Sequence, residues 1–255
     1  MKIISYNVNG IRAASTKNFF GWLQATDADM ICLQEIKAHP SQLIEIIALI
    51  ENLGYYHYWH PAQKKGYSGV AILTKIKPIH VEVGCGEEWI DAEGRVLRAD
   101  FENFSLISVY MPSGSSGEER QGKKYEFLSF FQDYIGTLKV SYPNLIISGD
   151  YNICHTEIDI HNPKSNAKTS GFLPEERAWI DLFINNGFVD TFRHFNKDPH
   201  HYTWWSYRAG SRGKNLGWRI DYHMASKAME NRLKSVRILP DAVHSDHCPV
   251  LLELN

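Results

Sequence analysis

The sequence predicts an α/β fold in which short buried strands alternate with amphipathic helices. The chain has 255 residues, which fits one large α/β or all-β domain or at most two small ones, and no shift in composition marks a boundary. We therefore expect a single domain over residues 1–255. Apolar runs without polar alternation, such as residues 145–147, indicate strands covered on both faces. Strand-like runs separated by only a few turn residues, as between residues 55 and 110, indicate antiparallel hairpins.

Helices and strands are expected along the whole chain. Apolar spacing predicts helices at residues 16–25, 40–52, 119–139 and 174–186. Pro40 and Pro174 near the starts of two of these helices, and Gly54 and Gly187 beyond their ends, are the usual helix punctuation. The expected strands are residues 2–6, 29–35, 55–60, 69–74, 79–83, 95–101, 104–110, 144–149, 218–224, 236–239 and 248–254.

The composition is typical of a soluble globular protein. Hydrophobic residues make up 44% of the chain and charged residues 22%, which is enough for a sizeable core. The formal net charge of −2 provides no global basic field, so any contact with nucleic acid must come from a local patch. The four cysteines are far apart and form no zinc-ligand spacing, so we expect them to be reduced. Because no signal peptide or membrane-spanning stretch is visible, we expect a cytoplasmic protein without a membrane partner. We also expect the protein to be a monomer.

Polar side chains follow one expected strand after another. The apolar run at residues 145–147 leads into Gly149, which permits a sharp turn, and then into Asp150 and Asn152, which point the same way in an extended chain. Taken alone, these residues are as typical of a turn as of a site, because Gly, Asp and Asn all favour turns. The same pattern recurs at other expected strand ends, which carry Asn7, Asn9, Glu35, Tyr110, Asp221, Asp246 and His247.

This repetition predicts a polar cluster along one edge of the sheets. Carboxylate, amide and water oxygens suit a hard divalent cation, Mg²⁺ with Mn²⁺ as a substitute. A magnesium site takes one or two protein carboxylates and leaves its other positions to water and phosphate. Hydrolysis of a phosphoester is the chemistry that such a site favours.

The motifs around these residues resemble those of the exonuclease III family of abasic-site endonucleases, within the wider endonuclease/exonuclease/phosphatase superfamily. They span nearly the whole chain in the family's order. They are Ser5-Tyr6-Asn7-Val8-Asn9-Gly10-Ile11-Arg12-Ala13, Leu33-Gln34-Glu35-Ile36-Lys37, Ser68-Gly69-Val70-Ala71, Tyr110-Met111-Pro112, Gly149-Asp150-Tyr151-Asn152, Gly171-Phe172-Leu173-Pro174-Glu175-Glu176-Arg177, Trp218-Arg219-Ile220-Asp221-Tyr222 and Ser245-Asp246-His247-Cys248-Pro249.

The resemblance implies a deoxyribonuclease-I-like fold, which is a four-layer α/β sandwich. Two mixed, largely antiparallel sheets pack face to face in this fold, with helices outside and the active site at one end. The resemblance also implies a magnesium-dependent DNA repair enzyme that hydrolyses the phosphodiester 5′ to abasic sites. Its partner would be double-stranded DNA with abasic sites or blocked 3′ ends, on which it would also act as a 3′-phosphodiesterase or 3′→5′ exonuclease.

The same resemblance implies how a metal ion is held. Glu35 would be the principal metal ligand, with Asn7 nearby and Asp246 as a second or outer group. Asn9 stands where some relatives carry aspartate, which removes one negative charge from the site and leaves open whether one or two metal ions bind. Lys37 is expected to be a solvated charge, because isolated lysines usually are.

Roles at the scissile phosphate follow from the resemblance as well. Asp150 would activate or orient the attacking water, and Asn152 would hydrogen-bond the water or the phosphate. His247, oriented by Asp221, would contact the phosphate. Tyr110 would complete these contacts together with Asn7.

Residues 202–218 interleave aromatic and basic side chains without an acidic one, which suits a nucleic-acid backbone and an unstacked nucleotide. We expect Trp205 to pack in the interior. By resemblance, Trp204, Trp218 and Ile220 surround a small apolar pocket that accepts a base-free deoxyribose and excludes a normal base by size. Further DNA contacts are expected from Asn166, Arg208, Arg212 and Lys214.

Two other functions remain open at this point. One is a phosphatase or phosphodiesterase on a small substrate such as a phosphoinositide or sphingolipid headgroup, against which the expected Trp204–Ile220 pocket and the Asn166 loop argue. The other is a catalytically silent nucleic-acid-binding module. The presence of Glu35 and Asp150 argues against that module, as does the presence of Asn152, Asp221 and His247.

Overall fold

The computed structural model describes residues 1–255, and its strands form two six-stranded sheets. The strand order in the first sheet is β11–β12–β1–β2–β4–β3. Its strands are β1 (Lys2–Asn7), β2 (Met30–Gln34), β3 (Tyr56–His60), β4 (Val70–Thr74), β11 (Leu233–Ile238) and β12 (Val250–Leu254). β1 and β2 are parallel, and all other neighbours in this sheet are antiparallel.

The second sheet has the strand order β5–β6–β7–β8–β10–β9. Its strands are β5 (His80–Val83), β6 (Val96–Asp100), β7 (Ser105–Tyr110), β8 (Leu145–Asp150), β9 (Phe188–Asp190) and β10 (Asp221–Ser226). Here β7 and β8 are the parallel pair, and the other neighbours are antiparallel. Each sheet therefore has one parallel pair at its centre.

The residues of each central strand are shared between two cores. In β1, Ile4 joins the core between the first sheet and its helices, whereas Ile3 joins the core between the two sheets. In β8, Ile147 joins the core under the other helices, and Ile146 faces the first sheet. Because both faces of these strands are covered, their sequences lack polar alternation.

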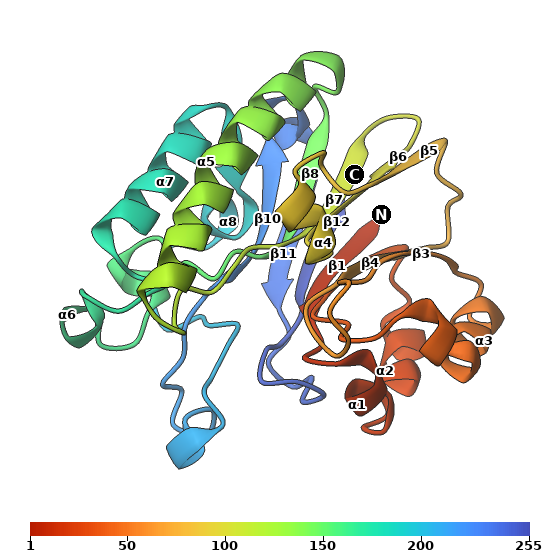
Figure 1. Cartoon of the computed structure of the whole chain (residues 1–255), viewed down its shortest axis with the longest axis horizontal. Coiled ribbons are helices and arrows are strands. Elements are labelled where there is room, and N and C mark those ends of the chain that lie inside the picture. Colours follow the sequence, from red (N-terminus) through yellow and green to blue (C-terminus); the bar gives the residue numbers. More distant parts are fainter.

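Helices cover the outer face of each sheet and complete the expected four-layer sandwich (Figure 1). Those on the first sheet are α1 (Ile11–Ser15), α2 (Phe19–Thr26) and α3 (Ile44–Asn52), and those on the second are α5 (Glu118–Ser141) and α7 (Pro174–Asn185). The shorter helices are α4 (Glu88–Ala92), α6 (Pro163–Asn166), α8 (Thr191–Phe195), η1 (Pro40–Gln42), η2 (Glu157–Asp159), η3 (Arg208–Gly210) and η4 (Lys227–Arg232). None of the helices combines the length and apolar character needed to cross a membrane.

Some expected element bounds are wrong. The helix expected at residues 16–25 begins only at Phe19, as α2, because Asn18 before it has a left-handed φ of 62°, and the preceding helix α1 was not expected. The helix expected at residues 40–52 begins as the 3₁₀ helix η1 before α3. The strand expected from residue 218 begins only at Asp221, because the backbone of Trp218 pairs with Trp204 instead of with the sheet.

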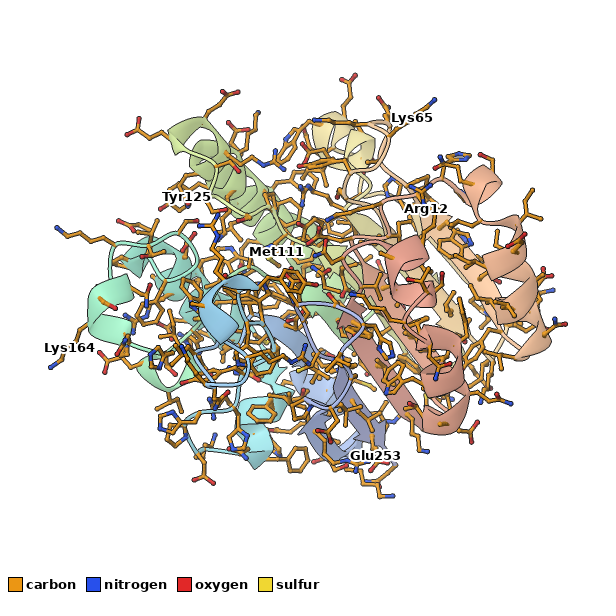
Figure 2. The ribbon with its side chains drawn as sticks, turned by 90° about the horizontal axis from the view of Figure 1, so that it is seen from below. Arg12, Lys65, Met111, Tyr125, Lys164 and Glu253 are labelled. Carbon is orange, nitrogen blue, oxygen red and sulfur yellow. The ribbon has the colours of Figure 1, made fainter.

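The two parallel pairs end on the same side of the sandwich. Asn7 ends β1 in register with Gln34, and Tyr110 ends β7 in register with Asp150. Asp221, the first residue of antiparallel β10, is also paired with Asp150. Figure 2 views the molecule from this side, with Met111 near the centre, the basic residues Arg12 and Lys65 towards one side and Lys164 on the other.

Candidate active site

Asn7 connects the two carboxylates that the strand ends bring together. Its Nδ2 group donates to Oε1 of Glu35 at 2.8 Å and to Oδ2 of Asp150 at 2.9 Å. Asn7 and Glu35 come from the first sheet and Asp150 from the second, so this amide links the two sheets. A neutral amide with two N–H donors can hold two anionic oxygens close together without adding charge.

The loops that leave these strands turn through residues with left-handed backbone. Glu35 has a φ of 50° and Asn152 a φ of 53°. The N–H of Asn152 donates to Oδ1 of Asp150 at 2.8 Å, so this tight turn fixes the orientation of the carboxylate. Gly149 was expected to provide the turn, and this is wrong: a Cβ there would lie 1.9 Å from the carbonyl oxygen of Val109, so glycine permits the close approach of β7 and β8.

His247 is paired with Asp221 beside Asp150. Its Nδ1 group donates to Oδ2 of Asp221 at 2.9 Å, and its Nε2 lies 3.8 Å from Oδ2 of Asp150. Burial alone would lower the pKa of His247, but Asp221 and the other nearby carboxylates raise this pKa to about 10. The pKa of Asp150 is raised to about 7, mainly by burial and further by the Asp221 carboxylate, while His247 opposes the rise. The imidazole is therefore held in one orientation with Nε2 towards Asp150.

A buried arginine supports Tyr110. The guanidinium of Arg95 lies 4.8 Å from the centre of the Tyr110 ring and donates from Nη1 to the Tyr110 carbonyl oxygen at 2.7 Å. Burial, with a further contribution from Glu35, raises the pKa of Tyr110 well above its ordinary value. The phenol thus stays protonated at neutral pH and can donate a hydrogen bond. Sequence analysis missed Arg95, although an arginine at the start of an expected strand was an available signal.

Lys37 belongs to the site, which corrects the expectation of a solvated charge. Its Nζ lies 2.7 Å from Oε2 of Glu35 and donates to Oδ1 of Asn9. Burial alone would raise the pKa of Glu35, but Lys37 and Asn7 hold this pKa below its usual value. Glu35 is therefore an ionised carboxylate that shares one oxygen with a lysine.

Asp246 is held by hydrogen bonds on both carboxylate oxygens. Oδ1 accepts from Nδ2 of Asn9 at 2.9 Å and from Oγ of Ser245 at 3.1 Å, and Oδ2 accepts from Nε1 of Trp204 at 3.0 Å. These contacts tie the His247 loop to the Asn9 loop and to the aromatic segment that contains Trp204.

The group best arranged to hold a metal ion consists of Glu35, Asp150 and His247. One potential ligand atom of each residue lies within 4.8 Å of the other two. The two carboxylates fit a hard divalent cation, whereas the imidazole is already bonded through Nδ1 to Asp221. Asp246, expected as a further metal group, lies outside this cluster.

Aromatic side chains form one wall of a cavity of about 330 Å³ beside these groups. Trp204, Trp218 and Ile220 all line it together with His247, as expected, and Gly171 forms part of the same wall. Trp204 and Trp218 meet edge to face, with ring centres 6.0 Å apart. The wall is placed by the backbone, because Trp204 forms β-bridges with both Trp218 and His247. Trp205 is buried, as expected.

The basic residues of the 202–218 segment differ in what they contact. Arg208 and Lys214 are exposed. The Arg212 guanidinium instead donates to three backbone carbonyl oxygens, at distances of 2.7 to 2.9 Å, so the structure does not present it as a free DNA contact. Asn166 also uses its amide internally, since Nδ2 donates to the carbonyl oxygens of His161 and Asn162 at 3.0 Å.

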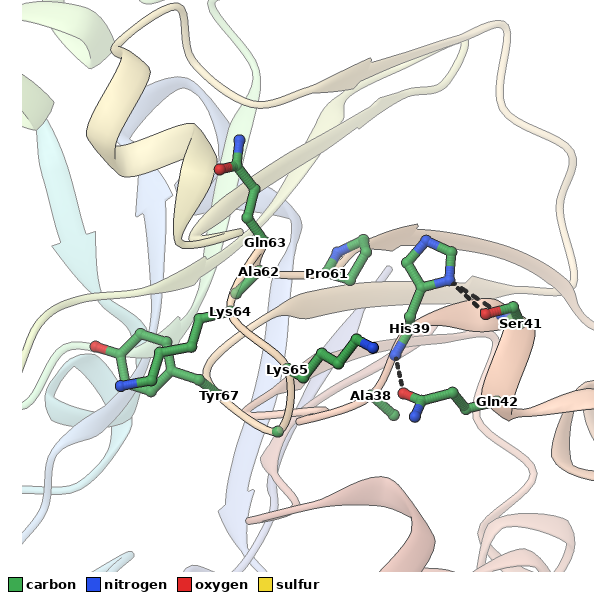
Figure 3. Close-up of a pocket in the computed structure, with 11 residues that line it drawn as sticks. Ala38, His39, Ser41, Gln42, Pro61, Ala62, Gln63, Lys64, Lys65 and Tyr67 are labelled. Atoms are coloured by element: carbon green, nitrogen blue, oxygen red, sulfur yellow. Dashed lines mark hydrogen bonds between the residues drawn. The ribbon is translucent and has the colours of Figure 1, made fainter.

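A second cavity, of about 490 Å³, lies between residues 38–42 and residues 61–67 (Figure 3). Lys64 and Tyr67 lie side by side in this view, with the ammonium 5.4 Å from the ring centre. The Tyr67 hydroxyl accepts hydrogen bonds from Arg95 at 3.1 Å and from Arg120 at 2.6 Å. Arg95 therefore connects this cavity to Tyr110 in the candidate active site.

Comparison with known proteins gives concordant matches over the whole chain. Residues 4–247 match the Endonuclease/Exonuclease/phosphatase family. The chain is 43% identical to an exodeoxyribonuclease of Bacillus subtilis, with 100% of both chains covered. It is 42% identical to the DNA repair nuclease APEX1 of Danio rerio, covering 100% of this chain and 82% of that protein. The solved structure of an AP endonuclease from Archaeoglobus fulgidus superposes with a TM-score of 0.90 at 28% identity, covering 100% of this chain and 99% of the other.

Proposed function

The chain belongs to the endonuclease/exonuclease/phosphatase family and is a hydrolytic DNA repair nuclease of its exodeoxyribonuclease and AP endonuclease class, and we propose that residues 1–255 form one magnesium-dependent domain that incises duplex DNA 5′ to abasic sites. We propose 3′-phosphodiesterase and 3′→5′ exonuclease activity at the same site. One observation carries the choice of substrate: the groups suited to phosphate hydrolysis and a small aromatic wall line the same cavity of about 330 Å³.

The protein's own residues suit a water attack on a phosphodiester. Asp150 would orient the water and accept its proton, because Asn7 and the backbone N–H of Asn152 fix both of its oxygens. Nε2 of His247 would donate to a phosphate oxygen, while Asp221 holds the other ring nitrogen. The Tyr110 hydroxyl would be a further donor. These groups position the reactants and neutralise charge, which is what phosphoryl transfer requires of a protein.

Glu35 would hold the divalent cation, and Asn7 would keep the Glu35 carboxylate oriented towards Asp150. When bound, Mg²⁺ or Mn²⁺ would supply charge neutralisation at the phosphate oxygens. Asp246 has a different proposed role, because its hydrogen bonds hold Asn9 and Trp204 in place.

Recognition of the abasic nucleotide would depend on size. Trp204, Trp218 and Ile220 offer apolar contacts to a deoxyribose without a base, and this wall would exclude a normal base by its size. Exposed Arg208 and Lys214 would contact the DNA backbone.

The test is incision of a duplex oligonucleotide that carries one tetrahydrofuran abasic analogue, with and without Mg²⁺. This analogue blocks lyase chemistry, so only hydrolysis is counted. We expect magnesium-dependent cutting immediately 5′ to the analogue in the wild type and its loss in Glu35→Ala and Asp150→Asn. Glu51→Gln is the matched control, since Glu51 is an exposed carboxylate of α3 that does not line this cavity, and the variant should cut normally.

Two results would contradict the proposal. A wild type that binds the duplex and never cuts it would indicate a binding module. A wild type that neither binds nor cuts the duplex, but hydrolyses small phosphodiesters, would indicate an enzyme of small substrates.

A further inference from the structure

Two oppositely charged side chains, Lys124 and Glu176, are completely buried beside the turn that contains Asn152. Nζ of Lys124, on α5, lies 2.6 Å from Oε1 of Glu176, on α7, and both side chains are 0% exposed. Burial lowers the pKa of Lys124, and the Glu176 carboxylate opposes this effect. Neither residue lines the cavity or belongs to the group formed by Glu35, Asp150 and His247.

Glu176 fixes the loop in front of its own helix. Its Oε2 accepts from the backbone N–H of Gly171 at 2.6 Å and from that of Leu173 at 3.0 Å. Its Oε1 also accepts from Nε2 of Gln121 at 3.0 Å. The motif from Gly171 to Arg177 is therefore a short loop followed by the first turn of α7, and its penultimate residue, Glu176, holds the backbone of the loop.

Lys124 fixes the backbone of a residue in the proposed catalytic group. Its Nζ donates to the carbonyl oxygen of Asn152 at 2.8 Å. Asn152 has a left-handed φ of 53°, which asparagine adopts more readily than other non-glycine residues, and the hydrogen bond from Lys124 holds its carbonyl group in this turn. The ammonium is therefore one of the contacts that keep the Asn152 N–H directed at Asp150.

The same loop supports the aromatic wall. Gly171 has a φ of +95°, and a Cβ there would lie 2.9 Å from the Trp218 ring and 3.1 Å from the Asn152 carbonyl oxygen. Gly171 also accepts from the N–H of Cys154 at 2.7 Å through its carbonyl oxygen. The loop held by Glu176 thus lies against both Asn152 and Trp218.

We propose that Lys124 and Glu176 are a positioning pair, which holds Asn152 and the Gly171 loop in the geometry needed for phosphodiester hydrolysis. This inference rests on the proposed function. Fold stability alone does not require the pair, because apolar side chains of similar volume often replace a buried ion pair at no loss of stability. The pair lies where two loops of the site meet, and it satisfies backbone groups of both.

The test compares the variants Lys124→Met and Lys124→Met/Glu176→Gln with the wild type. The single variant leaves an unpaired buried carboxylate, whereas the double variant is neutral and keeps an acceptor for the Gly171 N–H. The control, Lys123→Met/Glu126→Gln, removes an exposed ion pair of 2.6 Å on the same helix. For each variant, kcat and KM are measured on the tetrahydrofuran duplex and on undamaged duplex, together with the thermal unfolding midpoint.

We expect kcat to fall by about 10- to 100-fold in the double variant, with KM changed by less than about threefold, as for other residues that orient catalytic groups. The control should retain wild-type kcat. A double variant that folds and keeps wild-type kcat overturns the proposal, even if the single variant does not fold.

A second measurement separates this inference from the proposed function. In ¹⁵N spectra without DNA, the amide resonances of Asn152 and Gly171 should shift in the double variant and stay unchanged in the control. If the wild type cuts neither duplex, the proposed function has failed, and these resonances decide the positioning role: unshifted signals overturn it, and shifted signals support it.

Discussion

Nδ1 of His247 and Oδ2 of Asp221 are 2.9 Å apart, although 26 residues separate them in the sequence. Both side chains are buried, and the other Asp221 oxygen, Oδ1, has no hydrogen-bond partner. A buried carboxylate that makes one side-chain hydrogen bond leaves a polar atom unsatisfied, which carries a free-energy penalty. The arrangement is therefore better explained by the orientation and charge of His247 than by stability of the fold.

Replacing Asp221 by Asn is expected to lower kcat for abasic-site incision on the order of 100-fold, with little change in DNA affinity. Asparagine keeps the shape and an acceptor oxygen but removes the negative charge that favours the protonated imidazole. Single-turnover incision and DNA binding in the absence of Mg²⁺ measure the two quantities.

The control for this prediction is Asp181→Asn. Asp181 pairs with His155 at 2.8 Å, but its side chain is 66% exposed, so it is a similar pair outside the site. Equal rates for Asp221→Asn and Asp181→Asn would refute the proposed role of Asp221.

Replacing Lys37 by Ala is expected to reduce the Mg²⁺ concentration needed for half-maximal activity. The Lys37 ammonium lies 2.7 Å from Oε2 of Glu35, where it competes with a cation for the carboxylate. Because the Lys37 side chain is 31% exposed, solvent screens the interaction, and we expect a shift of no more than about fivefold. The measurement is a Mg²⁺ titration of the incision rate.

Lys75→Ala is the matched control for Lys37, because Lys75 forms an ion pair with Asp27 and has a side-chain exposure of 30%. This control should leave the titration unchanged. A higher Mg²⁺ requirement in Lys37→Ala would mean that Lys37 assists metal binding instead of competing with it.

The basic residues of the 202–218 segment are expected to separate into two classes. Arg208→Ala and Lys214→Ala should each weaken DNA binding for every sequence and reduce the slope of log K against log salt by roughly 1. Arg212→Ala should instead lower the thermal unfolding midpoint, because its guanidinium donates to three carbonyl oxygens of the loop before His247. Salt titrations of DNA affinity and thermal unfolding of the free proteins distinguish the classes.

A salt slope reduced in Arg212→Ala, with an unchanged unfolding midpoint, would show that Arg212 is a DNA contact after all. Arg237→Ala, at an exposed position of β11, is a control that should change neither quantity.

The sequence was informative where a buried strand ends. Apolar runs without alternation identified the central strands, and the polar residue after each run had to lie at a sheet end, so the placement of Asn7, Glu35, Tyr110 and Asp150 followed from local patterns. The short strand β9 was missed, because three residues are too few for a periodic pattern and it is placed by its pairing with β10.

Contacts between the sheets could not be predicted from the residues alone. The hydrogen bond from Asn7 to Asp150 spans 143 positions and depends on how β1 packs on β8. Lys37 was expected to be a solvated charge. Its contact with Glu35 could not be foreseen, because it depends on left-handed backbone at both residues, with φ values of 51° and 50°. The environment of Lys124 was equally inaccessible, since nothing in the sequence of α5 marks this lysine as buried, and it meets Glu176 only through the packing of α5 on α7.

Stability is expected to depend on pH through His223, a buried residue that bridges the two sheets. Its Nε2 group donates to the Val250 carbonyl oxygen at 2.9 Å, and its Nδ1 accepts from Oγ of Ser148 at 2.7 Å, so the folded protein holds a neutral imidazole. Burial lowers the pKa of His223 to about 4. The unfolded chain has a histidine pKa of about 6.5, so between these values the unfolded state binds more protons than the folded state.

The contribution of His223 to the free energy of unfolding should therefore be highest above pH 6.5 and fall as the pH decreases towards 4. The His223 contribution to this loss between pH 7.5 and pH 5.0 is roughly 2 kcal/mol. Urea unfolding at both pH values measures the total change, to which Asp150 and His247 contribute with the opposite sign because their pKa values are raised in the folded protein.

His223→Gln isolates the histidine term. Glutamine does not titrate, so the variant should lose about 2 kcal/mol less than the wild type between pH 7.5 and pH 5.0, whatever its stability at pH 7.5. His80→Gln is the control, because the His80 side chain is 52% exposed, and it should show the wild-type dependence. An identical pH dependence in His223→Gln and the wild type would show that the buried imidazole is not what makes the fold sensitive to acid.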